Sequence, residues 1–190
     1  MTDASEAVAT DHELLDAWCG GDREAGDALI RRHFEAVCRF FRGKLGDDIE
    51  DLVQCTFQVC VARRATLRAD GSFRGFMFGV ARHLLIDHLR RRYRRGEHED
   101  VEQHSLRALG TSPSAAVARD EREALVREAM LRISLEQRMI LELAHWEGCS
   151  GREIAEALEI GEHTVRSRLA RARAALREQV EALGGQWAQA

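Results

Sequence analysis

Residues 150–178, SGREIAEALEIGEHTVRSRLARARAALRE, constrain the fold more than any other stretch, because they predict two helices joined by a short turn. Ser150 followed three positions later by Glu153 is the pattern of a capping box, which starts a helix. Gly161 interrupts the first apolar stripe, and a second stripe begins after it. Two helical patterns with so short a connection are typical of a helix-turn-helix.

The second predicted helix has one apolar and one polar face. Its apolar residues recur as a single face of a helix requires: Val165, Leu169, Ala172 and Leu176. The opposite face carries side chains that can reach base edges in a major groove: His163, Thr164, Ser167 and Arg171. The flanks carry guanidinium groups that can hold phosphates: Arg166 and Arg173 on one side, Arg168 on the other. An ordinary amphipathic surface helix is the alternative, and the short turn after a capped helix favours DNA binding over it.

The rest of the chain also predicts helix. It contains one proline, Pro113, few aromatic residues, and an excess of Ala, Leu, Arg and Glu, which favour helix. Two more capping boxes, Thr10 with Glu13 and Ser134 with Gln137, predict further helix starts. We therefore expect an all-α protein.

The 190 residues are enough for two small helical domains. In residues 96–112 the helical periodicity fails and the sign of the charge reverses, which predicts a flexible linker. Ser112 and Pro113 then fit the N-cap and first turn of a new helix. The expected organisation is a domain over 10–95, a linker over 96–112 and a second domain over 113–183.

The cysteines indicate a reducing compartment. They are odd in number, scattered and without a CxxC pair: Cys19, Cys38, Cys55, Cys60 and Cys149. Cys55 and Cys60 lie five residues apart, which does not place two metal ligands on one helix face, so we expect no metal and no cofactor. The N-terminal residues show no secretory leader, and no uncharged stretch approaches the ~20 residues of a membrane span. We expect a cytoplasmic protein without membrane insertion.

Charge is distributed unevenly behind a net value of −4. Residues 63–95 contain 10 basic and 2 acidic side chains, whereas residues 1–62 contain 6 basic and 13 acidic ones. A protein that binds DNA tightly by itself is usually basic overall, because phosphate neutralisation supplies most of the non-specific affinity. This chain is therefore expected to need a partner to hold DNA.

Two segments of the first domain are candidates for contacts with partners. The helix predicted after Gly46 is apolar over more than half of its circumference, so it is either a central core helix or a docking face. The following basic segment, residues 71–95, places Phe76 and Phe78 ahead of an arginine cluster, a composition typical of single-strand binding. The alternative for these rings is a core aromatic cluster.

Within that basic segment the periodicity separates two sides. The apolar side contains Leu85, Ile86, Leu89 and Tyr93, and the polar side contains His83, Asp87, Arg90, Arg91 and Arg94. We expect Asp87 to pair with Arg91 at i+4.

Taken together, these motifs resemble a bacterial extracytoplasmic-function (ECF) sigma factor over residues 10–180. DDIEDLVQCTF is similar to the family's segment that docks on the coiled coil of the largest RNA polymerase subunit. FRGFMFGVARHLLIDHLRRRYRR is similar to the segment that captures and melts the minus-10 element, and EIAEALEIGEHTVRSRLARARAAL to the minus-35 helix-turn-helix.

The resemblance implies a role for each set of residues. It assigns core polymerase binding to Asp51, Leu52, Val53, Gln54 and Phe57. Minus-10 binding and melting fall to Phe76, Phe78, His83, Asp87, Arg90, Arg91 and Arg94, and minus-35 reading to the outward and flanking residues of the last helix. The implied partners are core RNA polymerase, through its coiled coil and its flap, promoter DNA and an anti-sigma factor. No residue is expected to catalyse a reaction.

The chain departs from the family pattern in the minus-10 segment. Phe76 and Phe78 stand where tryptophan and tyrosine are common, which keeps an aromatic ring at both positions. His83 stands where asparagine is frequent, next to the loop that holds a flipped base, so the base read there is open.

Two other functions compete with this interpretation. A stand-alone helix-turn-helix regulator would explain residues 150–178 but leave DLVQCTF and the arginine cluster without a role. A metal phosphohydrolase would rest on His83, Asp87 and His88, but neighbouring arginines repel a cation and no second acidic cluster completes the site.

Overall fold

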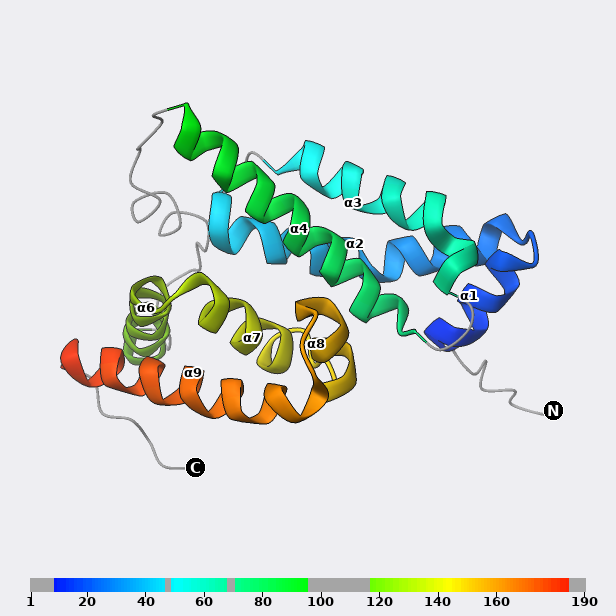
Figure 1. Ribbon diagram of the computed structural model, residues 1–190. Coiled ribbons are helices and arrows are strands. Elements are labelled where there is room, and N and C mark those ends of the chain that lie inside the picture. Colours follow the sequence, from blue (N-terminus) through cyan, green and yellow to red (C-terminus); the bar gives the residue numbers. More distant parts are fainter. Residues whose placement is uncertain (1–8, 47–48, 68–70, 96–116, 185–190) are drawn as a thin grey trace.

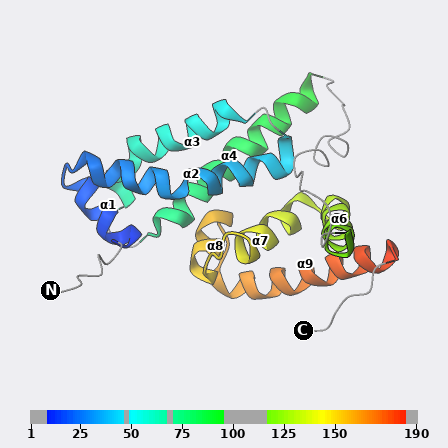
Figure 2. The same cartoon turned by 180° about the vertical axis from the view of Figure 1, so that it is seen from behind.

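The computed structural model describes residues 9–46, 49–67, 71–95 and 117–184, which form two helical modules (Figures 1 and 2). The first module contains α1 (Asp11–Cys19), α2 (Arg23–Leu45), α3 (Glu50–Arg63), the 3₁₀-helix η1 (Arg64–Leu67) and α4 (Phe73–Arg94). The second contains α6 (Val117–Arg132), α7 (Leu135–His145), α8 (Gly151–Leu158) and α9 (Glu162–Ala182). The described residues include no strand, and the all-α prediction is confirmed.

Helix starts follow the local capping chemistry. The Thr10 hydroxyl accepts from the Glu13 backbone N–H at 3.3 Å, while the Glu13 carboxylate accepts from the Thr10 backbone N–H at 2.7 Å. Reciprocal bonds of the same kind start α7 at Ser134 and α8 at Ser150. All three predicted capping boxes are therefore confirmed.

The first module packs α1, α3 and α4 around α2. Leu29, Val37 and Phe41 of α2 are fully buried in its centre. One side of α3 also belongs to this core, because Val53, Phe57 and Cys60 are buried. The sequence left open whether α3 is a core helix or a docking face, and the structure assigns this side of it to the core.

The second module packs α9 against α6, α7 and α8. Val165, Ala172 and Leu176 of α9 are buried, and Leu169 is half-buried. The inward face of α9 is therefore the predicted one. Gly161 is the N-cap of α9, and the turn before it contains Glu159 in the left-handed region, with φ of 54° and ψ of 45°.

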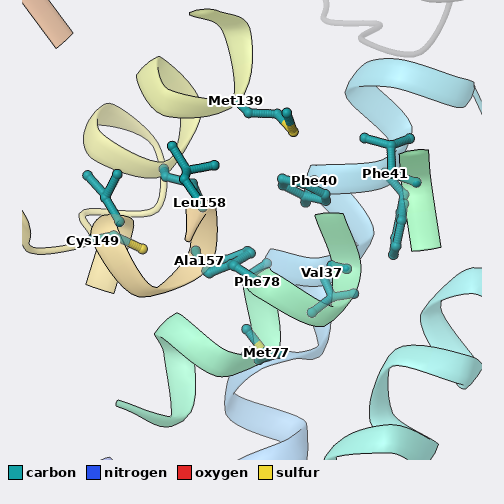
Figure 3. Close-up of a cluster of buried hydrophobic side chains, with 14 of the residues drawn as sticks. Val37, Phe40, Phe41, Met77, Phe78, Met139, Cys149, Ala157 and Leu158 are labelled. Atoms are coloured by element: carbon teal, nitrogen blue, oxygen red, sulfur yellow. The ribbon is translucent and has the colours of Figure 1, made fainter. Parts of the chain in front are cut away.

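The two modules share one continuous apolar core, which the sequence analysis did not predict. Figure 3 shows Phe40 of α2 and Phe78 of α4 beside Met139 of α7 and Leu158 of α8. Because α8 packs directly on α4, the helix-turn-helix lies against the segment assigned to minus-10 DNA.

The prediction for Tyr93, near the end of α4, is wrong, and the predictions for residues 96–113 are not tested by the structure. Tyr93 was placed on the apolar side of α4, but its side chain is 73 % exposed, because α4 runs past its neighbouring helices (Figures 1 and 2). The linker over 96–112 and the helix start at Ser112 and Pro113 lie outside the described residues.

Across the described residues, no helix is both long and apolar enough to cross a membrane.

Candidate DNA- and polymerase-binding surfaces

The outward face of α9 is open to solvent. His163, Arg166, Ser167, Arg171 and Arg173 are exposed, while Thr164 and Arg168 are half-buried. From His163 to Arg177 this helix contains no acidic residue, so its exposed face carries basic and polar side chains, together with Ala170 and Ala174. The structure thus brings all seven residues predicted to read minus-35 DNA onto one helix, whose opposite face is packed against the core.

Several of these side chains are oriented by neighbours. Arg168 pairs with Glu136 at 3.5 Å, and Arg173 donates to the His145 ring at 3.3 Å. Partial burial, together with the adjacent Arg173, lowers the pKa of His145, which favours the neutral ring that accepts this bond. The sequence analysis missed both partners, because they come from α7.

The C-terminal half of α4 presents the second basic surface. Asp87, Arg90, Arg91 and Arg94 are exposed there, as predicted. Asp87 pairs with Arg90 at 3.6 Å, one position earlier than the expected i+4 partner Arg91. Both spacings bring side chains together on a helix surface, so periodicity alone does not choose between them.

The two phenylalanines assigned to base stacking differ in burial. Phe76 is half-buried at the edge of the core. Phe78 is 1 % exposed and packs against Phe40, with 5.8 Å between ring centroids (Figure 3). The stacking role predicted for Phe78 is therefore wrong in this structure: two residues along a helix is about 200°, so the two rings face different sides.

His83 lies on the exposed side of α4, as predicted, but it is not free. Its Nε2 is 3.2 Å from Glu159 Oε2 of the second module, and Arg82 is 3.5 Å from the same carboxylate. In the described part of the chain, no cluster of three or more His, Cys, Asp or Glu side chains could hold a metal ion.

The predicted polymerase-binding residues of α3 point in two directions. Val53 and Phe57 are buried, and they form the floor of a groove between α2 and α3 with a volume of about 810 Å³. Gln54 lines the same groove and is exposed. Asp51 and Leu52 instead line a smaller hollow that faces Asp87 and Arg91 of α4.

The groove between α2 and α3 is notably apolar for a protein surface. It is lined by Ile30, Phe34, Cys38, Ile49 and Val61 in addition to the floor residues. Phe34 and Val61 are 45 % and 39 % exposed, and Phe34 stacks on Phe57 at 6.0 Å. An exposed apolar groove of this kind is typical of interaction sites, so α3 contributes one side to the core and another side to a candidate docking surface. Phe34 and Ile30 were missed as docking candidates because they lie in the helical pattern of α2.

The largest set of contacts missed by the sequence analysis joins the two modules. Arg39 of α2 donates to both oxygens of Glu147, at 3.1 and 2.9 Å. Lys44 is 2 % exposed and pairs with Glu142 of α7, and burial lowers its pKa despite this carboxylate. Glu153 caps α8 and also accepts from the Ser72 hydroxyl at 2.9 Å. Burial raises the pKa of Glu153, but its hydrogen bonds from Ser150 and Ser72 outweigh burial and hold that pKa below the ordinary 4.5.

Known protein families match both modules. The family model for Sigma-70 region 2 matches residues 29–95, and that for Sigma-70 region 4 matches residues 123–176. The chain is 30 % identical over 171 residues to the ECF RNA polymerase sigma factor SigM of Mycobacterium tuberculosis, covering 88 % of this chain and 83 % of SigM. It is 31 % identical over 183 residues to the RNA polymerase sigma factor NccH of Alcaligenes xylosoxydans xylosoxydans, covering 93 % and 95 % of the two chains.

A solved structure has the same fold. The sigma factor RpoE of Bartonella quintana, crystallised in complex with the anti-sigma factor NepR, superimposes with a TM-score of 0.63. The identity is 22 %, and the match covers 82 % of this chain and 96 % of RpoE.

These matches decide between the functions that the sequence left open. A stand-alone helix-turn-helix regulator would leave the match over residues 29–95 without a role, and nothing in the comparisons supports it. Sigma factors act as non-catalytic initiation factors. The two modules, their order and their relatives establish that the chain belongs to the ECF sigma factors, which bind core RNA polymerase and direct transcription initiation from specific promoters.

Proposed function

We propose that three surfaces of this sigma factor have separate roles. The helix α9 reads the minus-35 element, α4 binds and melts the minus-10 element, and α3 docks on the coiled coil of the largest polymerase subunit. The observation that carries this proposal is the placement of the exposed basic groups. Exposed arginines line the outward face of α9 and the C-terminal half of α4, although α2 also carries exposed arginines, and the apolar groove lies between α2 and α3.

On α9, we assign base-edge contacts to His163, Thr164, Ser167 and Arg171, which share the outward face. Arg166, Arg168 and Arg173 lie on the flanks and suit phosphate contacts. The hydrogen bond from Arg171 Nε to the Ser167 carbonyl, at 3.4 Å, is long and on the surface, so this guanidinium can turn toward a base at little cost.

On α4, we assign stacking to Phe76 and base or phosphate contacts to His83, Arg90, Arg91 and Arg94. Asp87, which pairs with Arg90, orients that guanidinium rather than meeting phosphate itself. Phe78 takes no part in DNA contact and holds α4 against α2.

On α3, we assign polymerase contacts to Asp51, Leu52 and Gln54, with Val53 and Phe57 supplying the groove floor. A groove with an apolar floor and polar rim suits the side of a coiled coil, whose helices offer alternating apolar and charged side chains. We assign a second polymerase contact, to the flap, to the second module.

We further propose that an anti-sigma factor regulates the chain, since a sigma factor of the same fold is held by one. The protein acts in the cytoplasm, where core polymerase is found, and performs no bond chemistry of its own.

The test compares promoter opening by core polymerase that carries either the wild-type chain or the Phe76→Ala variant. Promoter opening is measured by the permanganate reactivity of unpaired thymines. We expect Phe76→Ala to bind duplex promoter nearly normally and to give weak reactivity around minus-10. Wild-type reactivity in the variant would remove the stacking role, and loss of duplex binding would mean that the ring serves the fold.

A further inference from the structure

We propose that Tyr93 is a further DNA-contact residue of α4: its hydroxyl donates a hydrogen bond to a phosphate of the paired DNA between the minus-35 and minus-10 elements. The sequence analysis placed Tyr93 on the apolar side of α4 and gave it no role. This inference rests on the proposed binding of minus-10 DNA by α4, and it extends that binding to the duplex upstream.

The first observation is the exposure of Tyr93. Among the exposed large hydrophobic residues of the described part of the chain, it has the greatest exposed fraction, 73 %. Leu89, one turn earlier on the same side of α4, is half-buried and packs against the core. The core therefore ends between these two residues, where α4 extends beyond its neighbouring helices (Figures 1 and 2). The packing of the fold does not require an aromatic ring at this position.

The second observation is the charge around Tyr93. Residues 88–95 contain five arginines and no acidic residue. Arg90 lies one turn before Tyr93 and Arg94 follows it directly, and both are exposed. Arg90 is 3.6 Å from Asp87, and Arg94 Nε donates to the Arg90 carbonyl oxygen at 3.4 Å, so both guanidinium groups lie along the same stretch of helix surface. This charge favours a polyanionic partner, and tyrosine hydroxyls are among the groups that contact DNA phosphates.

The third observation is the distance along α4 between Tyr93 and Phe76. Tyr93 is 17 positions after Phe76 on the same helix, and at about 1.5 Å per residue the two are about 26 Å apart along the helix axis. Duplex DNA rises about 3.4 Å per base pair, so this span equals about seven or eight base pairs. The exposed basic residues of α4 follow its axis, which places DNA along the helix. Tyr93 and Phe76 therefore contact different parts of the promoter.

The order of the chain assigns the C-terminal end of α4 to upstream DNA. From this end the chain continues to the second module, whose helix α9 we assign to the minus-35 element, and that element lies upstream of minus-10. In paired DNA the bases are stacked inside the duplex, so a tyrosine ring has no free base face to stack on. The phosphates stay accessible, and their oxygens accept hydrogen bonds from hydroxyl groups. Phe76 is thus suited to the unpaired strand, and Tyr93 is suited to the backbone of the duplex.

The test compares Tyr93→Phe, which removes only the hydroxyl, with Tyr93→Ala, which also removes the ring. Because Tyr93 is exposed, both variants should unfold at the same urea concentration as the wild-type chain. Arg94→Ala, at the next position, is the matched control that removes a charge. Each protein is bound to core polymerase, and the affinity of the complex is measured on a promoter mapped with the wild-type chain.

The first readout is a scan in which the phosphates between the two promoter elements are replaced, one at a time, by neutral methylphosphonates. At one or two neighbouring phosphates, about seven or eight base pairs upstream of the base that stacks on Phe76, the replacement should weaken wild-type binding about two- to tenfold, as loss of a hydrogen bond does. Tyr93→Phe should bind unmodified DNA more weakly by a similar factor and lose clearly less at those phosphates. Equal losses for both proteins at every phosphate would overturn the contact, and so would a loss in Tyr93→Ala that Tyr93→Phe does not share.

The second readout is the dependence of affinity on salt. Tyr93→Phe should leave the slope of log affinity against log salt concentration unchanged, because a neutral hydroxyl releases no counterion, whereas Arg94→Ala should reduce the slope by about 0.9. A reduced slope for Tyr93→Phe would show that the substitution disturbs the arginines, and it would overturn the direct contact.

Permanganate reactivity around minus-10 separates this inference from the proposed function. Normal opening by the wild-type chain, together with wild-type affinity of Tyr93→Phe, would overturn the Tyr93 contact alone. A wild-type chain that opens no promoter with core polymerase would overturn the proposed function and this contact with it.

Discussion

Truncating Phe78 to alanine separates a core role from a DNA-binding role for this residue. The side chain is 1 % exposed and packs against Phe40 at the junction of both modules (Figure 3). Removing a fully buried phenylalanine costs about 3–5 kcal/mol, since the lost burial adds to the cavity left behind. For a chain of this length each kcal/mol lowers Tm by about 2–4 °C, so the expected drop is on the order of 10 °C.

Phe76→Ala is the matched comparison, because its ring is only half-buried at the edge of the same core. We expect it to lose about 1 kcal/mol, in line with the smaller apolar area that leaves the protein interior. The assay is urea unfolding of both variants followed by far-UV circular dichroism. Phe78→Leu should keep most of the stability, because it nearly conserves volume.

The opposite pattern of results would contradict the core role of Phe78. If Phe78→Ala lost less than about 1 kcal/mol and still failed to open promoter DNA, the ring would act on DNA and not in the core. A Phe78→Leu variant that is stable but inactive in promoter opening would point the same way.

Three further results are expected. Asp51→Lys should abolish binding to core polymerase in a pull-down with folding intact, whereas Asp27→Lys on the exposed side of α2 should not; equal binding by both would remove Asp51 from the docking surface. Arg171→Ala should weaken binding to DNA with a minus-35 element by about 1–3 kcal/mol and spare other sequences in a competition assay, and a uniform loss would make it a phosphate contact. Because the pKa of Glu153 is held below 4.5, its stabilising contribution is present above that value and is lost as pH falls through the lower folded value. Glu153→Gln keeps the capping-box pattern but makes its hydrogen bonds neutral, so it should cost about 1 kcal/mol at pH 7 in urea unfolding and flatten the acid loss, and an unchanged acid profile would contradict this assignment.

The features that could be predicted from the sequence are those set by neighbouring residues. The capping boxes at Thr10, Ser134 and Ser150 join side chains three positions apart, so a short window contains all of the chemistry. The inward face of α9 was predictable for the same reason, because helical periodicity places its apolar residues on one side.

Features that join distant segments were not predictable. The pair between Arg39 and Glu147 spans 108 positions, and neither residue has a local sign of its partner. Phe78 is buried by packing against Phe40 of α2, a residue distant in the sequence, and Tyr93 is exposed because α4 extends beyond its neighbouring helices (Figures 1 and 2). One wall of the apolar groove, on α3, could be predicted as a docking face. The other wall, on α2, could not, because its residues follow the pattern of an ordinary core helix.

Selection of promoters from a random DNA library tests the central claim most directly. Core RNA polymerase from the same bacterium would transcribe the library with and without this chain, and the templates of chain-dependent transcripts would be sequenced. The account predicts two conserved blocks at a fixed spacing, with the upstream block lost for Arg171→Ala and the downstream block altered for His83→Ala. Transcripts that are independent of the chain, or a single conserved block that the chain binds without polymerase, would contradict it.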